Sequence, residues 1–304
     1  MQPIVTLTMN PALDIATATD RVVPAHKLRC AAPRYDPGGG GINVARGVHA
    51  LGGGAIAIFP AGGAAGEMIR HLLEQEGVAH HPIAIAGFTR ESLAVDERET
   101  GRQYRFILPG PEISERDQER CLDELSLLAP KADFIVASGS LPIGVSDDFY
   151  TRVAELAKKL GKRLILDTSG SALKKAGGGI YLLKPSLREL EDLSGREIRS
   201  EGDQERAARQ IVEEGTARSL SCRSAPRAHS WPPPTGASAL PRSRSRQKAQ
   251  SALGTACWQE LFSVFAADCP CTKPFALAWR RGQRRSLERA PSCAGAPMSS
   301  GSTS

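Results

Sequence analysis

Before residue 219 the chain has no tryptophan and only two cysteines, Cys30 and Cys121. Nowhere does it hold an apolar run of the roughly 18 residues that a membrane span needs. Its start, MQPIVT, lacks the basic region and the long apolar core of a secretory signal. Two isolated cysteines fit a reducing compartment. We therefore expect a cytoplasmic protein with no membrane association.

The composition changes at residue 219. Residues 219–304 carry all three tryptophans, five of the seven cysteines and the Arg/Ser tract RSRSR, but only three acidic residues. The formal net charge of +6 therefore comes wholly from this tail, and residues 1–218 are mildly acidic. We divide the chain accordingly into a globular part, 1–218, and a basic tail, 219–304.

Short apolar runs alternate with amphipathic patterns through residues 1–218. The runs 134–137 and 164–166 have the length and content of buried strands. The segments 149–160 and 203–214 repeat their apolar residues at helical spacing. This alternation predicts an α/β fold in which helices flank a parallel sheet.

Four consecutive glycines stand in the run GGGGINVAR at residues 38–46 and lead into Asn43, on the first turn of an expected helix. Glycines let backbone amides approach an anion or a sugar closely, and a helix start adds unpaired N–H groups and partial positive charge. The alternative is a flexible turn. The run indicates a binding loop when its neighbours are considered.

An acidic residue and two basic residues surround this run in the sequence. The segment TLTMNPALD is an apolar strand that stops at a proline and places Asp14 just beyond the strand end, where ligands of open α/β sheets bind. Lys27 and Arg29 follow in a segment too short and mixed for a helix. A solvated turn or cap for Asp14, and a solvated surface charge for Lys27, are the alternatives. Together the residues predict a pocket for a phosphorylated polyol.

The order of these pieces resembles the ribokinase/PfkB family of sugar kinases. The likeness is closest to the minor-type 6-phosphofructokinase branch, and 1-phosphofructokinases and tagatose-6-phosphate kinases are also similar. It covers residues 1 to about 218 and then stops. The matching segments are TLTMNPALD, KLRCAAPRYDPGGGGINVAR, LGG with AIFPAGGAAGE, TRESLAV, GRQYRFILPG, SGSLP, LDTSG and KPSLRE.

The resemblance implies a ribokinase-like fold: a doubly wound, mostly parallel sheet with a small β lid built from segments near 15–35 and 88–108. Such a lid closes over the sugar and excludes water, and in related kinases its strands commonly form a homodimer contact. The last third of that fold is missing or replaced in this chain.

The resemblance also implies a reaction, the ATP-dependent and Mg²⁺-dependent phosphorylation of a sugar phosphate. Fructose 6-phosphate, converted to fructose 1,6-bisphosphate in glycolysis, is the first candidate, with tagatose 6-phosphate and fructose 1-phosphate as alternatives. Asp14, Gly39, Gly40 and Asn43 would hold sugar hydroxyls, and Asn43 offers both a donor and an acceptor. Lys27, Arg90 and Arg105 would neutralise the phosphate already present, and Ser138 would line the same cleft.

On the nucleotide side, the family motif Lys-Pro-Asn-x-x-Glu corresponds to KPSLRE in this chain. By resemblance Lys184, Ser186 and Glu189 would contribute to nucleotide binding, and Glu189 would hold Mg²⁺ through one of the waters that this ion keeps. Ser186 is shorter than the usual Asn and has no amide, which weakens the expected ATP placement. A solvated Glu at a helix start is the alternative for Glu189.

Three interpretations compete for the tail. Its Arg/Ser tract and basic clusters resemble a nucleic-acid-binding extension, so a noncatalytic sugar-phosphate binder with an adhesive tail is the second functional hypothesis. A metal site at Cys269 and Cys271 lacks a second ligand pair. The third interpretation is that residues 219–304 are read out of frame and are largely disordered.

The genetic code favours the third interpretation. If each codon starts one nucleotide earlier, SALGTACWQE at 251–260 is compatible with VGAGDSMLAG, the motif the family shows here. Segments 219–232 and 273–282 become family-like in the same frame and in the right order. The Asp of GAGD is the family's catalytic base, and its preceding amides form an anion hole. This chain has Thr255 and Ala256 there, so we expect it to lack a catalytic residue and to be inactive as a kinase.

Overall fold

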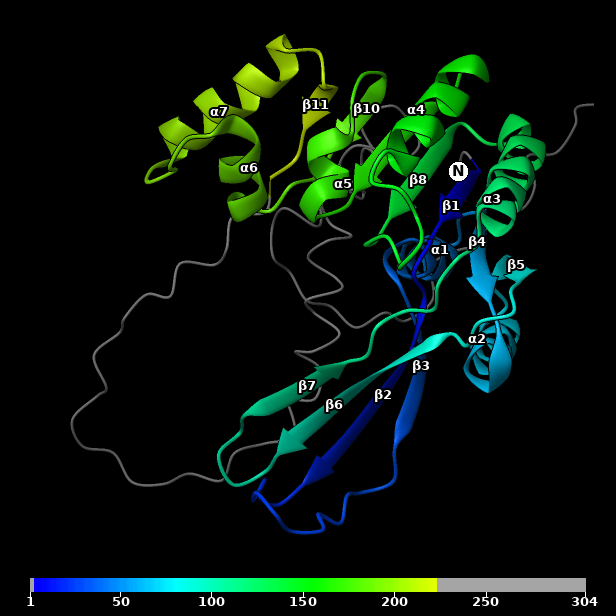
Figure 1. Cartoon of the computed structure of the whole chain (residues 1–304), viewed down its shortest axis with the longest axis vertical. Coiled ribbons are helices and arrows are strands. Elements are labelled where there is room, and N and C mark those ends of the chain that lie inside the picture. Colours follow the sequence, from blue (N-terminus) through cyan, green and yellow to red (C-terminus); the bar gives the residue numbers. More distant parts are fainter. Residues whose placement is uncertain (1–2, 223–304) are drawn as a thin grey trace, which may run out of the picture. The chain divides into compact units, whose positions relative to one another are not determined.

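A computed structural model describes residues 3–222 of the chain (Figure 1). Within them a seven-stranded sheet has the order β11-β10-β9-β8-β1-β4-β5, and every neighbouring pair is parallel. The strands are β1 (Ile4–Leu7), β4 (Ala55–Ala61), β5 (Ala79–Ala84), β8 (Phe134–Ser138), β9 (Arg163–Asp167), β10 (Ile180–Leu183) and β11 (Ala217–Leu220).

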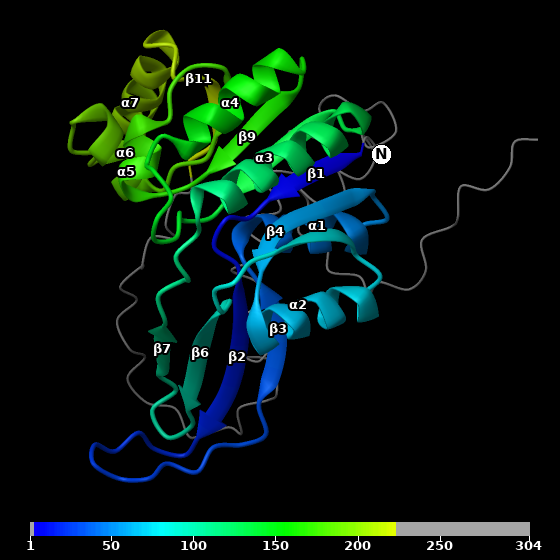
Figure 2. The ribbon, with the colours of Figure 1, turned by 45° about the vertical axis from the view of Figure 1, so that its right-hand side comes forward.

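Helices cover both faces of this sheet, and Figure 2 shows α3 and α4 on its near side and α1 on its far side. Buried side chains of α3 and α4 pack with Leu7 and Ile135, which point to one face of their strands. The helices are α1 (Gly40–Ala50), α2 (Gly63–Gln75), α3 (Glu115–Leu128), the short 3₁₀ helix η1 (Ala129–Lys131), α4 (Phe149–Lys159), α5 (Gly170–Lys175), α6 (Leu187–Ser194) and α7 (Glu201–Glu213).

The predicted α/β fold is confirmed for the described residues. The two apolar runs are the central strands β8 and β9, and they are buried almost throughout, as strands covered on both faces must be. The helical patterns at 149–160 and 203–214 correspond to α4 and α7. The predictions of a frame break and a disordered tail concern residues 219–304. Apart from residues 219–222, these residues lie outside the described part of the chain.

The expected lid is a second sheet of four strands in the order β3-β2-β6-β7. β2 pairs parallel to β6, while β3 and β7 are antiparallel to their neighbours. Its strands are β2 (Ala12–Thr19), β3 (Arg34–Gly38), β6 (Arg90–Glu97) and β7 (Gln103–Ile107).

The two faces of the lid differ in chemistry, because side chains alternate along each strand and paired residues share a face. One face, which we call the polar lid face, carries Asp14, Arg34, Asp36, Arg90, Ser92 and Arg105. The opposite face, which we call the apolar lid face, carries Leu13, Ile15, Tyr35, Leu93, Tyr104 and Phe106 together with Glu91, while Ile107 lies on the polar lid face.

The glycine run joins the lid to the main sheet. Gly38 ends β3, Gly39 precedes α1 with a φ of 122°, and Gly40 and Gly41 form the first helical positions. A Cβ on Gly41 would come within 2.8 Å of the Leu7 carbonyl oxygen and 2.6 Å of Thr8 Oγ1. Thr8 Oγ1 in turn accepts a hydrogen bond from the backbone N–H of Ile42 at 2.9 Å. Only glycine lets α1 start this close to the end of β1.

Replacing Gly41 by Ala tests this close approach. Alanine is favoured over glycine within a helix by about 1 kcal/mol, so a helix free of contacts would gain stability. Here the Cβ meets backbone, and we expect Gly41→Ala to lower the free energy of unfolding by about 1–3 kcal/mol in urea titrations. Gly54→Ala is the control, since nothing lies within 4 Å of its added Cβ. A gain in stability for Gly41→Ala would contradict the packing described.

Candidate active site

Asp14 lies inside the lid strand β2. The sequence had suggested a position just after the end of the first strand, outside any strand. β1 ends at Leu7, and the chain passes through Pro11 into β2, where Asp14 is the third residue. The proline breaks the segment, but a second pairing surface, offered by β3 and β6, lets a strand resume directly after it. The carboxylate packs against Gly38, whose added Cβ would lie 2.6 Å from Asp14 Cγ.

Charges of both signs surround Asp14. Burial raises the pKa of Asp14 above its ordinary value of 3.8, and the charge of Asp36, its partner across β3, raises it further. Arg105, Arg90 and, more weakly, Arg46 favour the ionised carboxylate and offset part of the shift. Burial also lowers the pKa of Arg90, and the charge of Asp14 opposes that change. A half-buried carboxylate among arginines is therefore available as a hydrogen-bond acceptor.

Arg90 is anchored at the junction between the lid and the main sheet. Its NH2 group donates to the backbone oxygen of Asn10 at 3.2 Å, and Asn10 Nδ2 donates to Ser140 Oγ at 3.3 Å. Within the described residues, Arg90 Nε and Asn10 Oδ1 are buried without a hydrogen-bond partner. Asn10 was missed from the sequence, although it stands in the same matching segment as Asp14. It links β6 of the lid to the loop after β8.

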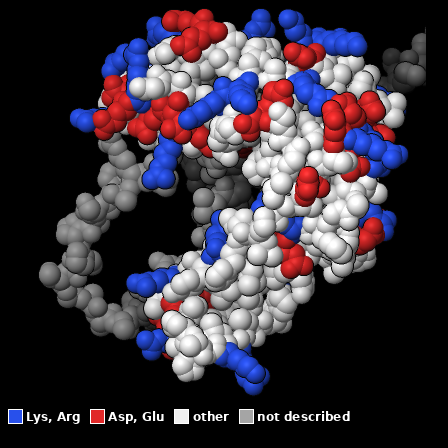
Figure 3. All heavy atoms as spheres, in the orientation of Figure 1, with Lys and Arg blue, Asp and Glu red and all other residues white. Residues whose placement is uncertain are grey.

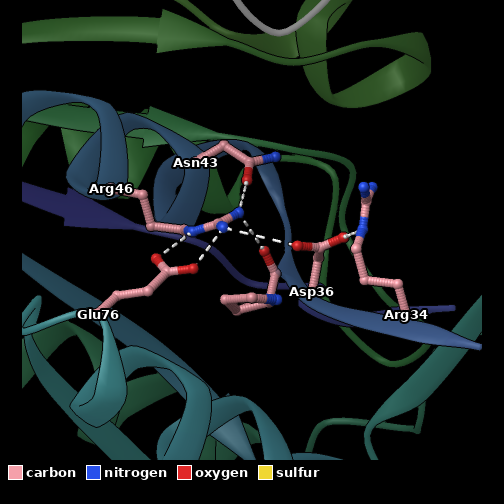
Figure 4. A network of polar contacts seen from close by, with 6 residues as sticks. Arg34, Asp36, Asn43, Arg46 and Glu76 are labelled. Carbon is pink, nitrogen blue, oxygen red and sulfur yellow. Dashed lines mark hydrogen bonds and ion pairs between the residues drawn. The ribbon is translucent and has the colours of Figure 1, made fainter. Parts of the chain in front are cut away.

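Asn43 is held by Arg46, one turn further along α1. Arg46 NH1 donates to Asn43 Oδ1 at 3.3 Å and to the carbonyl oxygen of Pro37 at 3.1 Å (Figure 4). The expected helical position of Asn43 is confirmed, since α1 begins at Gly40. Its amide oxygen accepts from Arg46, so the amide N–H groups face away from Arg46 and are free to donate to a ligand.

A hollow of about 290 Å³ lies where β8 and β9 end. Parallel sheets present ligand sites at the carboxyl ends of their strands, and here those ends supply hydroxyls, a glycine backbone and a carboxylate. The N-terminal end of α6 contributes from the side. The lining residues are Gly40, Ser138, Gly139, Ser140, Asp167, Thr168, Ser169, Ser186 and Glu189.

The turn after β8 is fixed from behind. Gly139 has a φ of 122°, and its carbonyl oxygen accepts hydrogen bonds from Tyr150 Oη at 2.8 Å and Thr168 Oγ1 at 3.0 Å. Burial strongly raises the pKa of Tyr150, so this phenol stays a hydrogen-bond donor at neutral pH. Ser138 and Ser140 are thereby presented on either side of a rigid turn. Neither Tyr150 nor Thr168 was predicted from the sequence.

Lys184 lies behind the hollow and does not line it. Its side chain is 1% exposed, and Nζ lies 2.9 Å from Asp167 Oδ2. Asp167 does line the hollow, so Lys184 acts on it through this carboxylate. Asp167 follows the apolar run 164–166 just as an acid at a strand end should, and that rule would have found it.

Ser186 and Glu189 form a reciprocal cap at the start of α6. The backbone N–H of Ser186 donates to Glu189 Oε2 at 2.6 Å, and the backbone N–H of Glu189 donates to Ser186 Oγ at 3.4 Å. Both side chains also line the hollow. Glu189 is therefore a capping residue whose carboxylate is held in place beside a polar cavity.

The other predicted residues divide into those that the fold brings together and those that it separates. Gly40 lies against Ser138 at the end of β8, whereas Gly39 lies against Thr8 and Pro11, which follow β1. Arg105 is on the polar lid face, and its charge acts on Asp14. Lys27 is exposed in the connection between β2 and β3, at the far end of the lid (Figure 1). That distance separates Lys27 from Asp14 within the described chain.

Residues 3–222 contain neither a cluster of metal ligands nor a membrane-spanning helix. No group of three or more His, Cys, Asp or Glu side chains is placed to ligate a metal directly. No helix there has both the length and the apolar content to span a bilayer.

Comparison with known proteins gives a consistent result. The sequence profile described as pfkB family carbohydrate kinase matches residues 7–220. The chain is 54% identical over 214 residues to the ATP-dependent 6-phosphofructokinase isozyme 2 of Mycobacterium tuberculosis, covering 70% of this chain and 63% of that protein. It is 46% identical over 220 residues to the protein of the same name from Escherichia coli, covering 72% and 71%.

The crystal structure of phosphofructokinase-2 from E. coli in complex with fructose-6-phosphate superposes with a TM-score of 0.69 at 43% sequence identity. The match covers 73% of this chain and 74% of that one. The chain thus aligns with less than two thirds of the M. tuberculosis relative, and the matched region ends close to the last described residue.

The raised pKa of Asp14 predicts how this residue affects stability. A carboxyl whose pKa is higher in the folded chain contributes most to stability below its ordinary pKa, and that contribution is lost as the pH rises through the folded pKa. Ionised Asp14 therefore costs stability at pH 7. We expect Asp14→Asn to raise the free energy of unfolding at pH 7, and the gain to shrink as the pH falls towards the ordinary pKa.

Urea titrations of both proteins between pH 4 and 7 measure this difference. Asp123→Asn, at an exposed position on α3, is the matched control and should show no such pH-dependent gain. A loss of stability for Asp14→Asn at pH 7 would mean that the arginines outweigh the cost of burial.

Proposed function

The chain belongs to the pfkB family of carbohydrate kinases, and on that premise we propose that residues 3–222 form the sugar-phosphate half of a 6-phosphofructokinase-like site. The observation that carries the proposal is the polar lid face, where the half-buried carboxylate of Asp14 lies within the electrostatic reach of Arg90 and Arg105. An acceptor for hydroxyls beside two cations matches a molecule that carries both hydroxyls and a phosphate.

Fructose 6-phosphate is the substrate that the relatives' names support. Asp14 accepts from sugar hydroxyls, while Asn43, with its oxygen bound to Arg46, donates to them. Arg90 and Arg105 neutralise the 6-phosphate through planar guanidinium groups. Tagatose 6-phosphate and fructose 1-phosphate have the same groups in other arrangements, so they are the competitors in a binding assay.

The hollow at the ends of β8 and β9 suits the phosphate end of ATP with Mg²⁺. Its serine and threonine hydroxyls and its glycine backbone match phosphate oxygens, and the carboxylates of Asp167 and Glu189 match a hydrated Mg²⁺. When bound, ATP supplies the phosphoryl group and Mg²⁺ neutralises its charge. Ser138, Ser140 and Ser186 orient oxygens there, and the lid, whose strand β2 carries Asp14, excludes water from the sugar. The hollow adjoins Gly40, so it meets the sugar side at the start of α1.

The polypeptide as it stands lacks the base that this chemistry needs. A general base must accept the proton of the attacking hydroxyl, and the family's Asp corresponds to Thr255, outside the described residues. We therefore propose that this chain binds the sugar phosphate but does not transfer phosphate to it. The alternative of a nucleic-acid-adhesive tail concerns residues 219–304, and no described contact favours it.

Binding without transfer is the expected result for the full chain. Isothermal titration should detect binding of fructose 6-phosphate. Asp14→Asn should weaken the affinity about 10- to 100-fold, because a charged hydrogen bond is lost. A coupled assay with ATP and Mg²⁺ should show no fructose 1,6-bisphosphate. A second chain, in which the codons from residue 219 onward are read in the frame that gives VGAGD, should be active in the same assay.

Two outcomes would contradict the proposal. Absence of fructose 6-phosphate binding in both chains would reject the sugar-phosphate site. Phosphorylation by the full chain at the rate of the frame-restored chain would reject the need for the missing carboxylate. Preference for tagatose 6-phosphate or fructose 1-phosphate in the titration would reassign the substrate within the same chemistry.

We further propose that a second copy of the chain covers the apolar lid face. Tyr35 is 41% exposed, Leu93 36% and Phe106 52%, which is unusual for large apolar side chains that share one sheet face. The lid surface in Figure 3 is mostly uncharged, whereas charges of both signs crowd the helices of the main sheet. The same sheet carries the polar face, so a partner on its outer side would steady the site within.

Introducing a charge on this face tests the dimer. Phe106→Glu should shift sedimentation at micromolar concentration from dimer to monomer, since burying a carboxylate in an apolar contact is costly. Leu127→Glu is the control, because Leu127 is an equally apolar and 68% exposed residue on α3, away from the lid. A monomeric wild type, or an unchanged dimer of Phe106→Glu, would reject this interface.

A further inference from the structure

The side chain of Arg46, on α1, contacts residues of α1 and β3 and the C-terminal cap of α2. Its Nε and NH2 groups donate to the two carboxylate oxygens of Glu76, at 2.6 and 2.5 Å, and Glu76 ends α2. NH1 donates to the carbonyl oxygen of Pro37 on β3 and to Asn43 Oδ1 on α1. NH2 also lies 3.9 Å from Asp36 Oδ1. Figure 4 shows the guanidinium in the middle of these partners.

This arrangement fixes which way the amide of Asn43 faces. A guanidinium has only donors, so the atom of Asn43 that faces it must be the oxygen. The amide nitrogen then points away from Arg46, as Figure 4 shows. Asn43 is thereby a hydrogen-bond donor to whatever binds beside it, although an asparagine free to turn over offers either group.

The donor character of Asn43 complements Asp14. An ionised carboxylate only accepts hydrogen bonds, while the oriented amide donates. One sugar hydroxyl can satisfy both by donating its proton to Asp14 and accepting from Asn43. A turned-over amide would place a second acceptor there and would leave that hydroxyl oxygen without its donor.

Arg46 also attaches the lid to the main sheet. β3 is an edge strand of the lid, and its residues 36 and 37 are the ones that Arg46 contacts. The bidentate contact with Glu76 fixes the guanidinium plane, which a lysine ammonium would not reproduce. The Arg46 side chain is 26% exposed, so the contact with Glu76 is only partly screened by solvent.

We propose that Arg46 is a positioning residue: it orients the amide of Asn43 as a donor to the sugar and anchors the lid strand β3 to α1 and α2. The proposal rests on the sugar-phosphate site described above. No contact between Arg46 and the sugar is required: its main effect on affinity passes through Asn43, and its charge acts only weakly on Asp14.

A double-mutant cycle on the full chain tests the orienting role. We expect Arg46→Met to weaken fructose 6-phosphate binding about tenfold. Asn43→Ala should weaken it at least as much, and the double variant should equal Asn43→Ala to within about twofold, because Arg46 acts through Asn43. A merely structural role predicts additive losses. Arg46→Lys should not restore affinity, and Glu76→Gln, which keeps the shape of the side chain, should give a smaller loss.

The control is Arg70→Met, on α2. Arg70 makes the same kind of contacts with Glu67 and Glu74 but has no described contact with the lid or with Asn43. It should leave the affinity unchanged to within about twofold. Additive losses in the cycle, or unchanged affinity in Arg46→Met, would overturn the orienting role.

Hydrogen exchange tests the anchoring role without any ligand. Amides of β3 should exchange faster in Arg46→Met than in wild type, and should exchange at the wild-type rate in Arg70→Met. Unchanged exchange in Arg46→Met would overturn the anchoring role. If wild type fails to bind fructose 6-phosphate while the β3 amides still exchange faster in Arg46→Met, the proposed function is rejected and the anchoring role is supported.

Discussion

The close approach between the glycine run and the ends of β1 and β8 is the constraint on which the site depends. A side chain at Gly40 or Gly41 would overlap Ser138 or the backbone of β1, so the start of α1 can reach these strand ends only without a Cβ. Because α1 follows β3 directly, the same contact sets where the lid leaves the main sheet. The proposed sugar side and the proposed phosphate side of the site therefore meet where α1 begins.

Around that joint the protein buries charge at a cost in stability. Asp14 is half-buried with another carboxylate, Asp36, as its register partner, and its pKa is raised as a result. The arginines at 46, 90 and 105 offset part of this cost, and each comes from a different element, α1, β6 and β7. Such a balance is typical of functional sites, where a group suited to its ligand is not at its most stable in the free protein.

The two sides of the site differ in how the residues are held. On the sugar side, side chains reach across from separate elements, and polar atoms of Asn10 and Arg90 remain without partners. On the phosphate side, the partners are local or come from buried groups behind the hollow, as with the cap formed by Ser186 and Glu189 and the hydrogen bonds to Gly139. The hollow is thus preformed, while the lid side has polar capacity to spare for a ligand.

The sequence by itself determined the layers of the fold and suggested several candidate ligand groups. Two apolar runs predict β8 and β9, because they are too short for helices and too apolar for strands with one exposed face. Four glycines before Asn43 predict a tight helix start. The sequence misplaced Asp14. A proline indicates where a strand must stop, but it does not show that two neighbouring strands let another strand begin directly after it. Alternating residues of a strand can be assigned to the two faces of a sheet only when the partner strands are known.

Only the tertiary structure decided which distant side chains act together. Tyr150 has no local pattern that marks it, and the segments that contain Asn10 and Thr168 do not show which groups these residues reach once the chain is folded. Lys184 and Lys27 are both plausible phosphate ligands by residue type, yet one is buried against Asp167 and the other lies at the far end of the lid. Local chemistry is written in residue types and spacing, whereas the partner of a charge depends on contacts between residues far apart in the chain, and these exist only in the folded protein.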